Sequence, residues 1–215
     1  MIKEEISIVI VDDHPMLLKG LSDVLTGRRY PVLDSALNGF DAVDIILTRR
    51  PVIAILDIEM PGLSGFEVIK KCCEQECQTK FIILTSHKEK AFIQKARDLK
   101  ISGYLLKDEP FHEIEACILA VAAGGEYFSR SFNEVFRKEI SPLLERIQFL
   151  SPSEKKIVQL IAQVKTSKEI GEMLNISHRT VQKHRANIIS KLVLPPGRDV
   201  LMAWAIENRE FLSSL

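Results

Sequence analysis

Five polar residues of types that bind cations and phosphoryl groups follow directly after short apolar runs in the first half of the sequence. In chain order they are Asp12, Asp13, Asp57, Thr85 and Lys107, and the runs are Ile6–Val11, Val52–Leu56, Phe81–Leu84 and Tyr104–Leu106. Carboxylates that lie close together stay ionised only when a cation offsets their repulsion. Mg²⁺ suits such oxygen ligands and commonly pairs with a phosphoryl group. If the five residues meet in space, they predict a site for Mg²⁺-dependent phosphoryl chemistry.

The chemical types in this set divide into an acceptor and its supporting groups. A carboxylate beside Mg²⁺ can attack phosphorus and form an acyl phosphate. The negative charge added in this way needs donors, which the Thr85 hydroxyl and the Lys107 ammonium can supply. A simpler alternative is that aspartates at strand ends cap the helices that follow them. That alternative suffices for Asp12 or Asp13 alone but does not explain the whole set.

Parallel β-strands would bring these residues to one edge of a sheet. Apolar runs alternate with segments of helical spacing, and five such strand–helix pairs predict a doubly wound, flavodoxin-like parallel sheet of the α/β class. The run Val32–Ala36 is less apolar than the others and is expected at an edge of the sheet. The predicted helices are Met16–Leu25, Ala42–Leu47, Phe66–Cys73, Phe92–Leu99 and His112–Ala123. Ligands of such sheets bind beyond the carboxyl ends of the strands, where the polar residues stand.

The second half of the chain has a wholly helical pattern. Residues 126–148 are typical of a linker with helical stretches, and the sheet domain is expected to close near Gly124-Gly125. The helices predicted after the linker are Ser153–Gln163, Ser167–Leu174, His178–Leu192 and Arg198–Glu207. Ser151-Pro152 and Ser177 are suited to begin helices. We therefore predict a first domain over residues 1–125, a linker over 126–148, and an all-α helix-turn-helix domain over 149–215.

Basic residues gather in the helix-turn-helix part. The 29 basic and 29 acidic residues cancel over the chain, but residues 148–215 carry 10 basic and 6 acidic residues, a net charge of +4. The second helix of such a motif enters the major groove of DNA, where Gln and Lys can read base edges and Arg and Lys can bind phosphates. Its apolar positions Val181, Ile188 and Leu192 can face the preceding helix, so the outward positions are Gln182, Lys183, Ala186 and Asn187. The alternative is a solvated face of a protein-binding helical bundle.

The overall composition is that of an ordinary globular protein. The 215 residues are 46% hydrophobic and 27% charged, which excludes a disordered chain. No apolar run approaches the roughly 18 residues that a membrane span needs, and the N-terminus lacks the features of a signal peptide. We therefore expect a cytoplasmic protein. The four cysteines, at positions 72, 73, 77 and 117, form no CxxC pair and are expected to be reduced packing thiols.

Motifs over residues 6–123 resemble the receiver domain of two-component response regulators. The matching stretches, all in family order, are IVIVDDHPMLLKGL, ILDIEMPGLSGFEVI, IILTS and GYLLKD. The resemblance implies that Asp57 is the phosphoacceptor and that Mg²⁺ is held by Asp12, Asp13, Asp57 and the backbone carbonyl of Glu59. It also implies that Thr85 is the switch hydroxyl, Lys107 the counter-ion of the phosphoryl group, and Tyr104 the aromatic residue that changes rotamer. In one departure, Asp108 follows Lys107 where many receivers have a proline.

Two neighbours of these residues are expected to tune the chemistry. Glu59 lies two residues after Asp57, and His87 lies two residues after Thr85, so both should flank the water that hydrolyses an acyl phosphate. We expect changes at these positions to alter the lifetime of the phosphoryl group. His14, next to Pro15, is interpreted more simply as the start of the first helix.

The segment LSPSEKKIVQLIAQVKTSKEIGEMLNISHRTVQKHRANIISKL resembles the LuxR/NarL-type DNA-binding domain, over roughly residues 149–211. By position, the resemblance implies that bases are read by Gln182, Lys183 and Ala186. The residues that it implies as phosphate contacts are Lys168, Arg179, Thr180 and Arg185. Two departures from the family pattern are Val164-Lys165, where Gly-Leu is common, and Gly171, where alanine is usual. A glycine inside a helix costs about 1 kcal/mol relative to alanine.

As a whole, the chain resembles a response regulator of the NarL/LuxR (FixJ) type. That resemblance implies a transcriptional regulator, not an enzyme, which receives phosphate from a sensor histidine kinase. It also implies a homodimer when phosphorylated, because two-fold protein dimers match DNA sites with two half-sites. Two alternatives stay open. One is the same architecture controlled by protein partners without phosphorylation, and the other is a phosphotransferase enzyme that uses an aspartyl phosphate.

Overall fold

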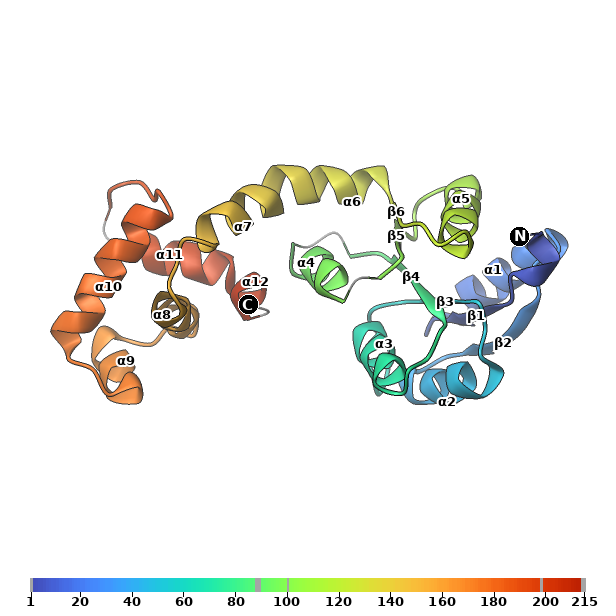
Figure 1. Cartoon of the computed structure of the whole chain (residues 1–215), viewed down its shortest axis with the longest axis horizontal. Coiled ribbons are helices and arrows are strands. Elements are labelled where there is room, and N and C mark those ends of the chain that lie inside the picture. Colours follow the sequence, from blue (N-terminus) through green and yellow to red (C-terminus); the bar gives the residue numbers. More distant parts are fainter. Residues whose placement is uncertain (1, 88–89, 100, 198, 214–215) are drawn as a thin grey trace. The chain divides into compact units, whose positions relative to one another are not determined.

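The computed structural model describes residues 2–87, 90–99, 101–197 and 199–213. The chain folds into two compact units, residues 1–134 and residues 135–215 (Figure 1). The boundary between them falls within the segment 126–148 that we predict to be a linker. None of the helices in the described ranges combines the length and the apolar character that crossing a membrane requires.

The first unit contains a parallel sheet of six strands in the order β2-β1-β3-β4-β5-β6. The strands are β1 (Ile8–Val11), β2 (Val32–Ala36), β3 (Ile53–Leu56), β4 (Lys80–Thr85), β5 (Gly103–Leu106) and β6 (Tyr127–Phe128). This order confirms the predicted doubly wound, flavodoxin-like fold, in which the chain reverses direction across the sheet between β1 and β3. β2 lies at an edge, as its weaker apolar character predicted, whereas β1, β3 and β5 are buried throughout.

The sixth strand was not predicted. β6 pairs with β5 in parallel, with Tyr127 opposite Gly103 and Phe128 opposite Tyr104. Phe128 stacks on Phe132 of α6 (Arg130–Val135), with ring centroids 4.7 Å apart, and Phe132 is buried. A strand of two residues is too short to give a periodic apolar pattern, so the sequence suggested that the sheet ended near Gly124-Gly125.

Five helices pack on the sheet, and their ends follow from local sequence. They are α1 (Pro15–Gly27), α2 (Gly39–Arg49), α3 (Gly65–Glu74), α4 (Lys90–Asp98) and α5 (Phe111–Ala122), and a 3₁₀ turn, Lys3–Glu5, precedes β1. α1 begins at a proline, the residue best suited to the first helical position. The side chain of Asn38 accepts a hydrogen bond from the backbone N–H of Asp41 at the start of α2, and Ser64 caps α3 in the same way.

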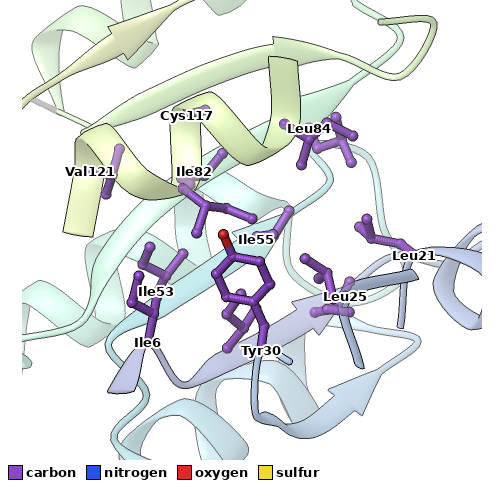
Figure 2. Packing of buried hydrophobic residues seen from close by; sticks show 14 of the residues in the cluster. Ile6, Leu21, Leu25, Tyr30, Ile53, Ile55, Ile82, Leu84, Cys117 and Val121 are labelled. Carbon is purple, nitrogen blue, oxygen red and sulfur yellow. The ribbon is translucent and has the colours of Figure 1, made fainter. Parts of the chain in front are cut away.

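One hydrophobic cluster joins α1 and α5 to one face of the sheet (Figure 2). The strands contribute residues at alternate positions, such as Ile53 and Ile55 of β3, because successive side chains point to opposite faces. Tyr30 is buried in the middle of this cluster. Cys117 of α5 belongs to it too, and burial raises the pKa of its thiol to about 12. All four cysteines are free thiols, but the predicted packing role holds only for the buried Cys72 and Cys117, because Cys73 is exposed and Cys77 is half-buried.

The second unit is all helical. After a π-helical turn, Phe136–Ile140, its helices are α7 (Ser141–Ile147), α8 (Pro152–Ala162), α9 (Ser167–Leu174), α10 (His178–Lys191), α11 (Val200–Glu207) and α12 (Arg209–Ser213). Ser151 and Thr166 begin α8 and α9 with reciprocal capping boxes, and Ser177 caps α10 as predicted. Asn175 ends α9 in the left-handed conformation. Arg198, where we placed the start of a predicted helix, lies outside the described residues.

Gly171 has a packing role that the sequence pattern did not reveal. A Cβ atom built on this residue of α9 would lie 2.7 Å from the carbonyl oxygen of Ile176, in the turn that leads to α10. The missing side chain therefore lets the turn pass close to α9, which offsets the conformational cost of a glycine in a helix.

Gly65 gives a test of the packing beneath Asp57. A Cβ atom at Gly65 would lie 2.1 Å from the backbone oxygen of Asp57, so Gly65→Ala must displace the loop after β3. We expect it to lower the free energy of unfolding by about 1–3 kcal/mol, the usual cost of overpacking. The matched control is Gly20→Ala in α1, where a Cβ atom would meet no described atom within 4 Å outside its chain neighbours and the nearby backbone of its own helix, and where helix propensity favours alanine. Urea unfolding followed by circular dichroism measures both, and equal stability of the two variants would contradict this account.

Candidate functional site

The predicted polar residues meet at the carboxyl ends of four strands. β1 and β3 end level with each other, with Val11 opposite Leu56, and β4 and β5 end level with each other two residues further on, with Thr85 opposite Leu106. Backbone hydrogen bonds continue this order one residue further, from the N–H of Asp57 to the oxygen of Val11 (2.9 Å) and from the N–H of Lys107 to the oxygen of Thr85 (2.8 Å). Lys107 therefore lies beyond the level of Asp57, and its side chain extends to that carboxylate.

Lys107 lies between two buried carboxylates. Its Nζ is 2.7 Å from Oδ2 of Asp12 and 2.7 Å from Oδ2 of Asp57, and these aspartates are only 2% and 5% exposed. Burial by itself lowers the pKa of Lys107, but the hydrogen bonds and charges of the two carboxylates outweigh this effect and raise it above its usual value. The ammonium therefore stays charged and offsets part of the repulsion between the carboxylates.

Both oxygens of the Asp57 carboxylate have partners. Oδ2 accepts the hydrogen bond from Lys107, and Oδ1 accepts one from the backbone N–H of Ile58 at 2.7 Å. These two donors fix the orientation of the carboxylate at the end of β3. A carboxylate held in this way is preorganised for reaction, because little side-chain freedom remains to be lost.

Asp13 and His14 complete the acidic end of the site. One ligand atom from each of Asp12, Asp13, His14 and Asp57 can be chosen so that all four lie within 4.8 Å of one another. Oδ1 of Asp13 is buried, and Nδ1 of His14 lies 2.8 Å from it. Oxygen ligands gathered in this way suit a hard divalent cation.

The sequence interpretation missed the position of the His14 ring. His14 precedes Pro15 at the start of α1, as expected, but Nδ1 of its ring also lies 3.1 Å from Oδ1 of Asp12. The only sequence signal for this was its place directly after the two aspartates. Whether its ring reaches them depends on the backbone turn between β1 and α1, which a sequence pattern does not specify.

A second group of residues extends from Thr85 towards β5. Thr85 is fully buried, and its Oγ1 accepts a hydrogen bond from the backbone N–H of His87 at 3.2 Å. The hydroxyl of Tyr104 donates to the backbone oxygen of His87 at 2.9 Å. Nε2 of the His87 ring lies 3.3 Å from Oε2 of Glu59, in the loop after β3. His87 thus joins the residues predicted to be the switch pair to one of the residues predicted to tune hydrolysis.

The predicted nucleic-acid surface lies on α9 and α10 of the second unit. Val181, Ile188 and Leu192 are fully buried, so they face the rest of the unit as predicted. Of the seven residues predicted to contact DNA, the exposed ones are Lys168, Arg179, Gln182, Lys183 and Ala186, and the half-buried ones are Thr180 and Arg185. Burial lowers the pKa of Arg185. An arginine in a protein nevertheless remains charged at neutral pH.

An ion pair between an exposed lysine and a buried glutamate holds the end of α10, and no sequence pattern predicted it. Nζ of Lys191 donates to Oε2 of Glu154 at 2.6 Å, and Glu154 is only 3% exposed. Burial raises the pKa of Glu154, but hydrogen bonds from Lys191 and Ser151 outweigh it, so that the pKa is lowered overall. The glutamate that caps α8 therefore also holds α10 in place.

Comparison with known proteins agrees with this two-part organisation. Residues 8–119 match the family model of the response regulator receiver domain, and residues 148–202 match the model of bacterial regulatory proteins of the luxR family. The chain is 35% identical over 188 residues to the transcriptional regulatory protein DesR of Bacillus subtilis, covering 87% of this chain and 90% of DesR. It is 30% identical over 213 residues to the oxygen regulatory protein NreC of Staphylococcus epidermidis, covering 94% and 97% of the two chains.

Solved structures show the same architecture. A DNA-binding response regulator of the LuxR family from Staphylococcus aureus aligns with a TM-score of 0.53 at 31% identity, covering 54% of this chain and 98% of that one. RcsB from Salmonella typhimurium aligns with a TM-score of 0.70 over 93% of this chain and 98% of its own, at 22% identity, and so shares the fold. The chain therefore belongs to the NarL/LuxR-type response regulators, in which a receiver domain is combined with a LuxR-type DNA-binding domain.

Proposed function

We propose that this protein is a phosphorylation-controlled transcriptional regulator of a two-component system. Asp57 accepts a phosphoryl group from the phosphohistidine of a sensor histidine kinase, and the modification switches DNA binding by the second unit. The observation that carries the proposal is the ammonium of Lys107, which lies 2.7 Å from a carboxylate oxygen of both Asp12 and Asp57. An acidic set with its own cation, at the ligand-binding edge of a doubly wound sheet, is suited to the gain and loss of a phosphoryl group.

The residues at this edge fit a magnesium ion. The donors are mainly carboxylate oxygens within 4.8 Å of one another, and Oδ1 of Asp13 is buried at this edge. Hard oxygen ligands of this kind suit Mg²⁺. Its ligands would be Asp12, Asp13, Asp57 and the backbone carbonyl of Glu59. When bound, Mg²⁺ neutralises charge on the carboxylates and on the transferring phosphoryl group.

In this proposal, Asp57 accepts the phosphoryl group, and Lys107, Thr85 and Tyr104 respond to the added charge. A carboxylate oxygen of Asp57 forms a bond to phosphorus while the bond between phosphorus and the donor imidazole nitrogen breaks, which leaves an acyl phosphate. The added negative charge attracts the ammonium of Lys107 and the hydroxyl of Thr85. Because the backbone of His87 joins Thr85 to Tyr104, movement of the hydroxyl biases the rotamer of Tyr104.

The second unit supplies the output. Gln182, Lys183 and Ala186 face the bases in this proposal, and the phosphate contacts are Lys168, Arg179, Thr180 and Arg185. A homodimer forms on phosphorylation and binds two half-sites of double-stranded DNA, because a two-fold protein matches a two-fold site. Both the DNA and the kinase domain that donates phosphate are cytoplasmic, so we place the protein in the cytoplasm.

Replacement of Asp57 tests the proposal directly. Asp57→Asn removes the nucleophilic oxygen with little change in shape, so acetyl phosphate should no longer increase DNA affinity, whereas the wild type gains at least about tenfold, or 1.4 kcal/mol. Fluorescence anisotropy with labelled DNA measures the effect. The control is Asp23→Asn on the exposed surface of α1, which should respond like the wild type. An unchanged response of Asp57→Asn would favour control by protein partners.

The stoichiometry of labelling separates a regulator from an enzyme. A regulator should stop at one phosphoryl group per chain on Asp57 and should not turn over a generic aryl phosphate. Mass spectrometry of the intact protein and a colorimetric turnover assay measure these two quantities. Continuous turnover that depends on Asp57 would support a phosphotransferase enzyme instead.

Replacement of Lys107 tests whether its positive charge stabilises the buried carboxylates of Asp12 and Asp57. Lys107→Met leaves the carboxylates of Asp12 and Asp57 buried without their cation, which should cost about 3–5 kcal/mol of stability when Mg²⁺ is removed. Added Mg²⁺ should then stabilise the variant more than it stabilises the wild type, because the ion replaces the lost charge. Thermal unfolding with EDTA and with Mg²⁺ measures both effects. The exposed Lys19→Met serves as control, and an equal effect of Mg²⁺ on all three proteins would refute this explanation.

The pair Glu59 and His87 gives a prediction about the lifetime of the phosphoryl group. Their side chains lie 3.3 Å apart beside the acceptor site, so replacing both with alanine changes access of water to the acyl phosphate. We expect phosphorylation to be retained and the hydrolysis rate to change by at least about tenfold, because positioned acid–base groups contribute roughly 10²–10⁴-fold to a rate. Loss of the labelled acyl phosphate with time measures it. His112→Ala, at an exposed histidine of α5, is the control, and identical hydrolysis rates in all three proteins would count against the role of the pair.

A further inference from the structure

A hydrogen bond across the helix-turn-helix motif holds the side chain of Gln182. Nε2 of Gln182, in the second turn of α10, donates to Oγ of Ser167 at the start of α9, at 3.2 Å. Nε2 of His178, one turn earlier in α10, lies 3.5 Å from the same amide nitrogen. The Gln182 side chain is exposed, and its Oε1 accepts no hydrogen bond from the residues that the structure describes. One end of the amide is therefore held by the protein and the other faces outward.

Ser167 is itself on a rigid support. Thr166 begins α9 with a capping box, in which Oε2 of Glu169 accepts from both the backbone N–H and the hydroxyl of Thr166 at 2.8 and 2.7 Å. α9 and α10 contact each other, and Ile170 of α9 and Val181 of α10 are fully buried. The hydroxyl of Ser167 thus has a defined position relative to α10, and it can restrict the rotation of the Gln182 amide.

The orientation of that amide decides which base it can read. A glutamine reads adenine by accepting from the N6 amino group and donating to N7, so it needs its carbonyl and one N–H side by side. An amide that rotates freely can turn its donor or its acceptor towards any base edge. When a base replaces the longer contact with His178, an amide still bonded to Ser167 presents its carbonyl and its second N–H to that base in one orientation.

We propose that Ser167 is a positioning residue, which fixes the amide of Gln182 so that Gln182 selects adenine at one base pair of each half-site. This inference rests on the DNA-binding function proposed above and adds to it the base that is read and the residue that sets the selection. Ser167 does not contact the base in this scheme but acts through Gln182. The gain arises from preorganisation, because the side chain loses less freedom when it binds.

Base discrimination by the full-length protein tests the proposal. The protein, activated with beryllofluoride, is allowed to select from duplexes with randomised half-sites, and the adenine preference at each base pair is quantified together with affinity for unrelated DNA. Ser167→Ala should lower the adenine preference at one base pair by about two- to tenfold, the scale expected of one immobilised side chain, and should leave the affinity for unrelated DNA unchanged. Gln182→Ala should abolish the preference at that base pair.

The double variant and two further controls make the test specific. Ser167→Ala/Gln182→Ala should match Gln182→Ala alone, because a residue that acts only through Gln182 has no effect without it. Ser167→Thr keeps the hydroxyl and should keep the preference. Ser153→Ala, at an exposed serine in the first turn of α8, should behave like the wild type. Circular dichroism and urea unfolding of each variant verify that the second unit remains folded.

Several results would overturn the inference. Additive effects of Ser167→Ala and Gln182→Ala, or a uniform loss of affinity for all sequences, would show that Ser167 binds DNA phosphates on its own. An unchanged base preference in either single variant would equally refute it. The proposed function fails on a different result, since it requires that beryllofluoride increases DNA binding. Selection of adenine that depends on Ser167 but not on beryllofluoride would support the inference and reject the phosphorylation switch.

Discussion

One ammonium group holds the functional edge of the first unit together. Nζ of Lys107 lies 2.7 Å from oxygens of Asp12 and Asp57, and both carboxylates are almost completely buried. Buried carboxylates so close together cannot remain charged without a cation, so every change of charge at Asp57 must redistribute the partners of Lys107. β5 ends two residues beyond the level of β1 and β3, so Lys107 depends on its long side chain to reach both carboxylates.

A series of contacts connects Thr85, at this edge of the sheet, with α6 at the end of the first unit. The backbone of His87 joins Thr85 to the hydroxyl of Tyr104, and the ring of Tyr104 lies 4.9 Å from the ring of Phe132 in α6. β6 is only two residues long, but its pairing with β5 places Phe128 against Phe132 and so extends the aromatic packing. A change at the acidic edge can reach α6 through packed aromatic side chains, with no need for a long flexible loop.

Sequence patterns predicted the parts of this structure that depend on periodicity and on strand ends. Alternating apolar runs are enough to predict a doubly wound sheet, and the polar residues directly after them predicted that Asp12, Asp13, Asp57 and Lys107 lie close together. The patterns missed contacts that depend on the exact path of a turn, such as the ring of His14 beside Asp12, or on pairs far apart in sequence, such as Glu154 and Lys191. They also missed the close approach of the turn between α9 and α10 to Gly171, because a single backbone contact does not change the periodicity of apolar residues.

The central claim is that the acidic edge accepts one phosphoryl-like group in the presence of a divalent cation. Fluorine NMR of the purified full-length protein with beryllofluoride, recorded with and without Mg²⁺, tests it most directly. The account predicts bound fluoride resonances at one equivalent per chain that need Mg²⁺ and disappear in Asp57→Asn. A protein that binds neither Mg²⁺ nor beryllofluoride, or that binds beryllofluoride equally well without Asp57, would contradict the account at its first step.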